Sequence, residues 1–308
     1  MKIFARKFRI DEDPSSQKTL LRMTTWRAMQ ILILTLLTLF ALPTFADDDS
    51  DDSTGRDDRQ TYHLSDAVDL ITQQKVDYDK PRIVIREVYP ELQNFDAEEQ
   101  QGVDGFNHRV SNIITEEADQ FKSGVTKTRD YQLTLPKSKV KNELAIDYNV
   151  SAIKSGANLI ISVRFSIQGY ATGMAHPYHH HRVLNYDLTN ARELTLADLF
   201  APDADYLPVL SQYSRKVLMR RLPNNDMITD GVTPTAEHFN NWNIKSNGLL
   251  ITFDEYQVAP YVFGPQTIRI PFSVLKDLIP ADSPISKCAR KKRCGGNNIL
   301  TGGFIDQA

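Results

Sequence analysis

The chain has 308 residues but only two cysteines, and it lacks both a glycine-rich phosphate loop and a Gly-x-Ser-x-Gly nucleophile turn. The missing turn removes the usual signature of a serine hydrolase. Asp254 and Glu255 are adjacent, so on an extended chain they are expected to point to opposite faces, unlike the paired carboxylates of a glycosidase. These absences favour a binding protein over an enzyme.

The sequence also lacks an apolar run long enough to cross a membrane. Its longest apolar run instead predicts an export signal. Arg27 precedes an apolar stretch at 31–45 that ends in Leu-Pro-Thr-Phe-Ala, with small residues at Thr44 and Ala46. This run is shorter than the roughly 20 residues that a membrane-spanning helix needs. We therefore expect a signal peptide at 1–46, cleaved after Ala46, with Met23 as an alternative start. The protein would then be periplasmic or secreted, with no stable membrane span; an uncleaved anchor is the alternative.

The expected mature chain is acidic. Residues 1–46 hold seven of the 36 Lys and Arg and three of the 39 Asp and Glu, which leaves 29 basic and 36 acidic groups, a net charge of about −7. This charge argues against nucleic acid as a partner and favours a cationic protein. The first part of the mature chain, 47–60, is an acidic tract that we expect to be a disordered linker.

The two cysteines, Cys288 and Cys294, flank the basic run Ala-Arg-Lys-Lys-Arg. In an exported protein, an even pair at this spacing predicts a disulfide. We expect a basic, disulfide-looped tail at 281–308, either solvated or in contact with anionic wall polymer or lipid headgroups.

Hydrophobic periodicity predicts an α+β fold, with antiparallel sheets, packed helices and two consecutive sub-domains at 61–158 and 159–280. Apolar spacing predicts a helix at 103–121 and a second helix at 206–222, with a short helical turn at 195–200. The expected strands lie at 83–89, 144–150, 159–167, 182–187, 249–253 and 267–272. Asn247-Gly248 has the composition of a tight hairpin turn.

The loop between the last two strands is unusually aromatic. It contains Tyr256, Val258, Pro260, Tyr261 and Phe263, where loops usually carry small polar residues. Rigid aromatic side chains offer a large contact area at little entropic cost. We interpret the loop as a binding surface; the alternative is that these side chains fold back into the core.

Four of the seven histidines lie in His-Pro-Tyr-His-His-His at 176–181. On a strand, His179 and His181 would share one face, so His176, His179 and His181 are weak metal-site candidates. Asp187 or Glu193 could complete such a site, but their spacing does not require it. We therefore expect no cofactor and no catalytic metal.

The order of short motifs over about 80–280 resembles the RsiV-type extracellular domain family. The motifs are Tyr89-Pro90, Asn107, Ile161-Ser162-Val163, Gly173-Met-Ala-His176, Asn185-Tyr-Asp-Leu188, 194–200, Phe253-x-x-Tyr256-x-Val-Ala-Pro-Tyr261-x-x-Gly264 and Ile270-Pro271. The family includes a lysozyme-sensing anti-sigma factor ectodomain and a non-catalytic module attached to PdaC-type peptidoglycan deacetylases.

The resemblance implies an α+β fold and a role in the cell envelope. Carried over by motif, Pro260 and Tyr261 lie in the loop that such a sensor presents to lysozyme, and His176 lies in a second loop where Met174 replaces a glycine. The expected partner-binding residues are Tyr256, Pro260, Tyr261, Phe263, Gly264 and His176. The expected partner is a lysozyme-like muramidase or peptidoglycan. A metal-assisted envelope hydrolase and a membrane-anchored lysozyme sensor are the alternatives.

Overall fold

The computed structural model describes residues 61–79, 82–94, 96–223, 225–296 and 298–302. The expected signal peptide, the acidic linker and the last residues of the tail lie outside the described residues. Across the described ranges, no helix is both long enough and apolar enough to cross a membrane.

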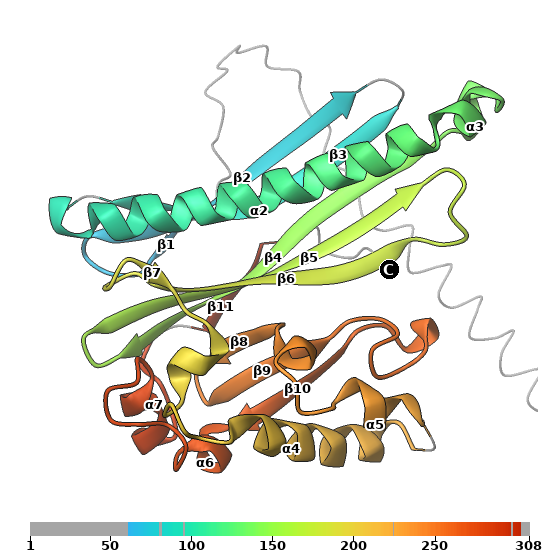
Figure 1. Ribbon diagram of the computed structural model, residues 1–308. Coiled ribbons are helices and arrows are strands. Elements are labelled where there is room, and N and C mark those ends of the chain that lie inside the picture. Colours follow the sequence, from blue (N-terminus) through green and yellow to red (C-terminus); the bar gives the residue numbers. More distant parts are fainter. Residues whose placement is uncertain (1–60, 80–81, 95, 224, 297, 303–308) are drawn as a thin grey trace, which may run out of the picture. The chain divides into compact units, whose positions relative to one another are not determined.

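Eight strands form the larger sheet, in the order β1-β2-β3-β4-β5-β6-β7, with β11 paired to β4 (Figure 1). Neighbouring strands are antiparallel except β3 and β4, because the chain crosses over through a helix between these two. The bounds are β1 Thr61–His63, β2 Val68–Asp79, β3 Ile83–Asn94, β4 Asn142–Ser155, β5 Asn158–Ala171, β6 Tyr178–Asp187, β7 Arg192–Glu193 and β11 Asn298–Gly302.

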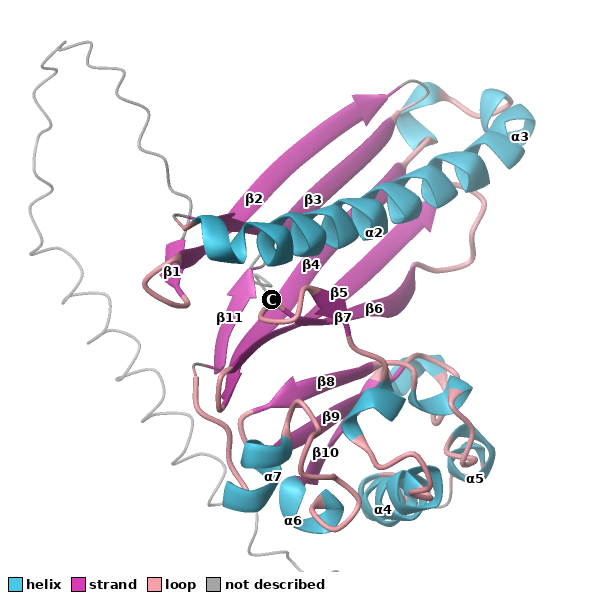
Figure 2. Cartoon of the chain, turned by 60° about the vertical axis from the view of Figure 1, so that its left-hand side comes forward, coloured by secondary structure: helices cyan, strands magenta, loops and turns pink. Residues whose placement is uncertain are grey.

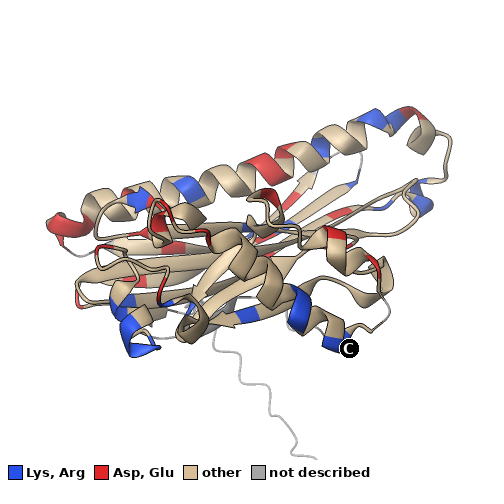
Figure 3. Cartoon of the chain, turned by 60° about the horizontal axis from the view of Figure 1, so that its bottom comes forward, with Lys and Arg blue, Asp and Glu red and all other residues tan. Residues whose placement is uncertain are grey.

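The crossover helix, α2 (Gln100–Lys127), covers one face of this sheet (Figure 1). The helix predicted at 103–121 is therefore confirmed and extends beyond both predicted ends. Its predicted apolar stripe is buried in the first core: Val103, Phe106, Val110, Ile113, Ile114 and Phe121. Charges of both signs are interspersed along α2 (Figure 3), so its outer face is an ordinary solvated surface. In the sequence, a short helix at Ala97–Glu99 (η1) precedes α2, and two more follow it at Arg129–Leu133 (α3) and Lys137–Lys139 (η2).

The second core lies under a smaller antiparallel sheet in the order β10-β9-β8. Its strands are β8 Trp242–Lys245, β9 Gly248–Phe253 and β10 Gln266–Pro271. Helices pack against its outer face: α4 Tyr206–Arg221, α5 Met227–Gly231, α6 Phe272–Leu275 and α7 Ser286–Lys291, with short turns at Leu196–Leu199 (η3), Glu237–Phe239 (η4) and Tyr261–Phe263 (η5).

A hairpin joins β8 to β9 as predicted, but its turn residues are Ser246 and Asn247, and Gly248 is the first residue of β9. Gly248 is required there because a Cβ atom would lie 2.2 Å from the carbonyl oxygen of Ile270.

The predicted division between 158 and 159 falls at the start of β5, directly after the turn from β4, and these two strands are neighbours in one sheet. Ile153 and Ile160 already belong to the second core, and all its other buried members lie at Leu194 or beyond, after the last residue of the first core, Leu188. The two-domain division stays a proposal.

The predicted disulfide between Cys288 and Cys294 is present. Its surroundings differ from the solvated alternative given for the tail, because Ile285, Cys288 and Ala289 are buried in the second core. Beyond the disulfide, Gly295 bridges Lys154, and β11 then runs beside β4 (Figure 2). The apolar residues of this segment explain the difference, since they supply a face that packs against α6 and β4.

A buried polar layer joins the two sheets. Ser162 and Asn185 project from the larger sheet on the side away from α2, and both are at most 2% exposed. The backbone N–H of Ile244 donates to Ser162 Oγ (3.0 Å), and Asn185 Nδ2 donates to the carbonyl oxygen of Trp242 (2.9 Å). The outward backbone groups of β8, an edge of the smaller sheet, are thus satisfied by side chains of the larger sheet.

The Ser162→Ala variant should lower the free energy of unfolding by about 2 to 3 kcal/mol, because it leaves buried polar groups without their partner. Ser162 Oγ also donates to Asn185 Oδ1 and accepts from Asn243 Nδ2. Urea denaturation of this variant, beside Ser166→Ala at a half-buried position on the same strand, measures the effect. Equal, small losses in both variants would contradict the role assigned to Ser162.

Candidate functional site

Two loops that are about 80 residues apart in sequence meet at one surface. The loop between β5 and β6 carries His176, and the loop between β9 and β10 carries Tyr256 and Tyr261. The Tyr261 ring packs on the His176 ring with centroids 4.2 Å apart, and its hydroxyl donates to the carbonyl oxygen of Pro177 (3.0 Å). The Tyr256 hydroxyl lies 3.4 Å from His176 Nε2. We call residues 173–178 and 256–264 together the two-loop surface.

This surface exposes large apolar groups to solvent. Val262 is 82% exposed, and Tyr256 and Phe263 are each more than half exposed. Pro260 is also exposed, whereas Tyr261 and Gly264 are half-buried. All six predicted partner-binding residues therefore belong to the two-loop surface, although their role in binding stays a prediction. Met174, in the same loop as His176, is 38% exposed.

One residue of the aromatic loop does not fit the sequence interpretation. Val258 is fully buried in the second core, and Ala259 is buried beside it. Tyr256 has a φ of 64°, and its N–H donates to the carbonyl oxygen of Ala259, so the chain turns back on itself and directs Val258 inward. The aromatic composition of the loop, on which the interpretation rested, does not indicate this turn.

The base of the loop is fixed by several hydrogen bonds. Gln257 Nε2 donates to the carbonyl oxygens of Gly231 and His238, each at 3.0 Å. Asn225 Nδ2 donates to the carbonyl oxygen of Val258 (2.7 Å). The loop also lies directly on Gly231, where a Cβ atom would be 2.0 Å from the Gln257 carbonyl oxygen. A loop held in this way loses little conformational entropy when a partner binds.

Two histidines of β6 hold the start of the same loop. His179 Nδ1 lies 2.9 Å from Glu255 Oε1, and His181 Nδ1 lies 2.6 Å from Asp254 Oδ1. The prediction that His179 and His181 share a face is correct. The expectation that Asp254 and Glu255 face opposite ways is wrong, because β9 ends at Phe253 and the chain is no longer extended there.

This pairing gives the metal-assisted alternative no support. His179 and His181 each face their own carboxylate, while His176 packs among the tyrosines. Within the ranges that the structure describes, no three His, Cys, Asp or Glu side chains are grouped so that they could hold a metal ion. The geometry is that of a scaffold that supports a loop.

The remaining histidine of the cluster faces the opposite side of the sheet. His180 Nε2 and Arg182 Nη1 bind the two carboxylate oxygens of Glu117 in α2, at 3.0 and 2.9 Å. Burial raises the pKa of Glu117, but the hydrogen bonds and charges of His180 and Arg182 outweigh it, and the net pKa is lowered. Sequence reasoning missed Glu117, although a carboxylate within the apolar stripe of a helix was a visible signal.

Comparisons with known proteins agree with this architecture. Residues 197–273 match the family model described as "Protein of unknown function (DUF3298)", so the chain contains a DUF3298 domain. A solved structure of a DUF3298 family member from Bacteroides fragilis NCTC 9343 has a TM-score of 0.50 at 19% identity, covering 73% of this chain and 97% of that one. The likeness confirms the predicted α+β fold.

A curated relative is also similar in sequence. The peptidoglycan-N-acetylmuramic acid deacetylase PdaC of Bacillus subtilis strain 168 is 31% identical over 156 residues, which is 50% of this chain and 32% of the deacetylase. The chain thus spans about a third of the length of this relative. The expected likeness to a PdaC-type protein is confirmed, whereas the narrower assignment to the RsiV-type family stays a prediction.

The Glu117→Gln variant should be less stable than the parent protein by about 2 to 3 kcal/mol near pH 7, because it loses a buried charged partner of His180 and Arg182. The lowered pKa means that the carboxylate stabilises the fold above its unfolded-state pKa of about 4.3 and that this contribution disappears as pH falls through the folded-state pKa. The stability difference should therefore shrink below about pH 4. Urea unfolding of both proteins at pH 7 and pH 3.5 tests this, and a pH-independent difference would contradict it.

Proposed function

We propose that this protein is an exported, non-enzymatic binding protein of the cell envelope, and that its two-loop surface recognises a lysozyme-like muramidase. The observation that carries the proposal is the exposed aromatic cluster formed by two loops, one of them built on a fixed base. Large aromatic groups at the centre of a contact are typical binding hot spots.

The charge of the chain supports a cationic partner. The body that follows residue 46 has a net charge of about −7, and lysozyme-like enzymes that act on anionic walls are commonly basic. Opposite net charges speed the encounter of two proteins, and this effect weakens as salt is added. We therefore expect the association rate with such a partner to fall with ionic strength.

The comparisons support the envelope setting. The PdaC relative is by its name a peptidoglycan deacetylase, although this chain covers only 32% of it. The RsiV-type resemblance adds the lysozyme partner, because its motif places Pro260 and Tyr261 in the sensor's contact loop. Peptidoglycan is the second candidate ligand, and it is favoured by the substrate in the relative's name.

The proposed location is the periplasm or the exterior, after cleavage at Ala46. If 31–45 were instead retained in the membrane, the same surface would belong to an anchored lysozyme sensor. Mass spectrometry of the exported protein separates the two, since an N-terminus at Asp47 supports the secreted form and an intact N-terminus in the membrane fraction supports the sensor.

The Tyr261→Ala variant should bind a cationic lysozyme about 30-fold more weakly, a loss of about 2 kcal/mol, because it removes the ring that joins the two loops.

The Val262→Lys variant should weaken binding by a similar factor without changing the melting temperature, because Val262 is 82% exposed and the new charge repels a cationic partner. Calorimetric titration and thermal unfolding of the same samples measure both effects.

Tyr78→Ala and Val76→Lys are matched controls, because both residues are exposed on β2. The controls should bind as the parent protein does. If Tyr261→Ala lowers the melting temperature and Val262→Lys leaves binding intact, the two-loop surface is not the lysozyme site. Sedimentation of all variants with insoluble peptidoglycan tests the second candidate ligand.

A further inference from the structure

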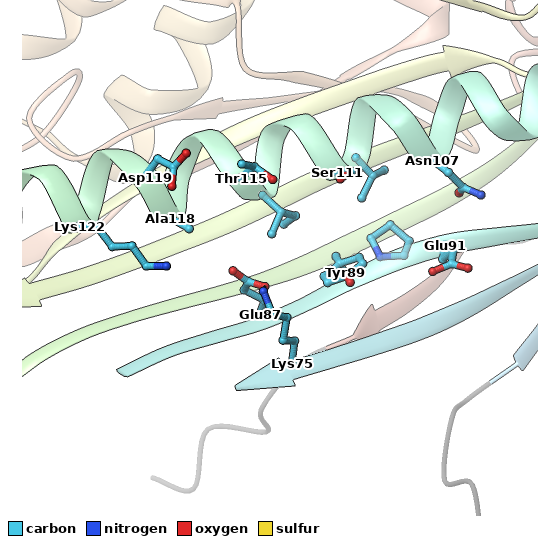
Figure 4. A pocket seen from close by; sticks show the side chains of 13 residues that line it. Lys75, Glu87, Tyr89, Glu91, Asn107, Ser111, Thr115, Ala118, Asp119 and Lys122 are labelled. Carbon is cyan, nitrogen blue, oxygen red and sulfur yellow. The ribbon is translucent and has the colours of Figure 1, made fainter. Parts of the chain in front are cut away.

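A polar groove that shares no residue with the two-loop surface lies between α2 and the strands β2 and β3. It encloses about 420 Å³, within the range of small-molecule sites, roughly 300 to 1,000 Å³. Figure 4 shows Glu87, Tyr89 and Glu91 on its strand side and Ser111, Thr115 and Asp119 on its helix side. None of these residues belongs to the two-loop surface.

The strand side combines a buried carboxylate with an aromatic ring. Glu87 is only 5% exposed, and it forms an ion pair at 3.4 Å with Lys75, whose side chain is 59% exposed. Tyr89 is half-buried beside it. Burial raises the pKa of the Tyr89 phenol, and Glu87 and Glu91 raise it further, so the phenol stays a neutral hydrogen-bond donor.

The helix side offers hydroxyl and carboxylate groups in one row. Ser111, Thr115 and Asp119 follow each other at four-residue spacing, and all three are exposed. The apolar floor between the two sides is formed by Val110, Ile114 and Ala118. Asn107 is engaged elsewhere, since its amide both donates to and accepts from the backbone of Leu92.

The charges of the groove argue against an anionic ligand. Lys75 is paired with Glu87, and Lys122 is paired with Asp77 at 3.1 Å. Glu91 and Asp119 add two further negative groups to the lining. A phosphate or carboxylate ligand would therefore meet more repulsion than attraction.

We propose that this groove binds a neutral oligosaccharide of N-acetylated hexosamine units. Sugar hydroxyls would donate to Glu87, Glu91 and Asp119, while one sugar face and an acetyl methyl would pack on Tyr89 and the apolar floor. The site goes beyond the two-loop surface and shares with the proposed function only the envelope setting. Through this groove the protein would bind wall glycan while the two-loop surface remains free for its partner.

The test titrates the β-1,4-linked tetramer of N-acetylglucosamine into the purified full-length protein and follows backbone amide shifts by NMR. The Thr115→Arg variant places a long side chain across the groove from an exposed helix position, so it should fold normally and bind the tetramer at least tenfold more weakly. The matched control is Gln120→Arg, which is exposed on the same helix but outside the groove lining. It should bind as the parent protein does, and the glucose tetramer should bind more weakly to all three proteins.

Shifts confined to α2, β2 and β3 that are lost in Thr115→Arg would establish the site. Absence of saturable binding, equal affinity in Thr115→Arg and Gln120→Arg, or equal affinity for the glucose tetramer would overturn it. Lysozyme binding is measured on the same variants and should be unchanged by Thr115→Arg. Loss of sugar binding in Val262→Lys alone would move the sugar site to the two-loop surface and also overturn the groove.

Discussion

The position of the smaller sheet depends on the hydrogen bonds made by the outward backbone groups of its edge strand, β8. Its outward backbone groups have side-chain partners, Ser162 and Asn185, which belong to adjacent strands of the larger sheet. Such bonds are directional, so they fix the register between the sheets in a way that apolar contact alone would not. With that register set, the end of β9 lies opposite β6, and Asp254 and Glu255 reach His181 and His179. The two-loop surface therefore depends on a buried layer that contains none of its residues.

The exposed aromatic residues of the two-loop surface also depend on the buried residues of the loop between β9 and β10. Val258 enters the second core and Ala259 is buried beside it, and the positive φ of Tyr256 is the turn that permits this. Left-handed backbone at a tyrosine costs about 1 kcal/mol or more, so it persists only where surrounding contacts hold it. Burial of Val258 and the bonds from Gln257 provide those contacts. The aromatic side chains of the loop are exposed because the adjacent Val258 and Ala259 are buried and hold the loop in place.

Sequence reasoning reached the two long helices and the strands β3, β4, β5, β6, β9 and β10, but it missed β1, β2, β7 and β8 and the pairings between elements. The apolar stripe of α2 and the alternation of β4 and β5 are local signals, and the structure follows them. The ties from Glu117 to His180 and from Asp254 to His181 join residues more than 60 positions apart, and no local pattern encodes which side chains will meet. The final strand β11 escaped prediction for the same reason, since its partner β4 lies about 150 residues earlier.

The buried layer also links the two sheets electrostatically to the site. Burial lowers the pKa of Lys245 to about 8, and the charges of Arg164 and Arg269 contribute to the same shift. Arg164 is itself desolvated and bonds Thr252, while the charge of Asp254 opposes the lowering of its pKa. The carboxylate of Asp254 therefore interacts with the charge of Arg164 and also lies 2.6 Å from His181 Nδ1. The favourable interaction between the charges of Arg164 and Asp254 thus adds to the hydrogen bonds at the start of the loop.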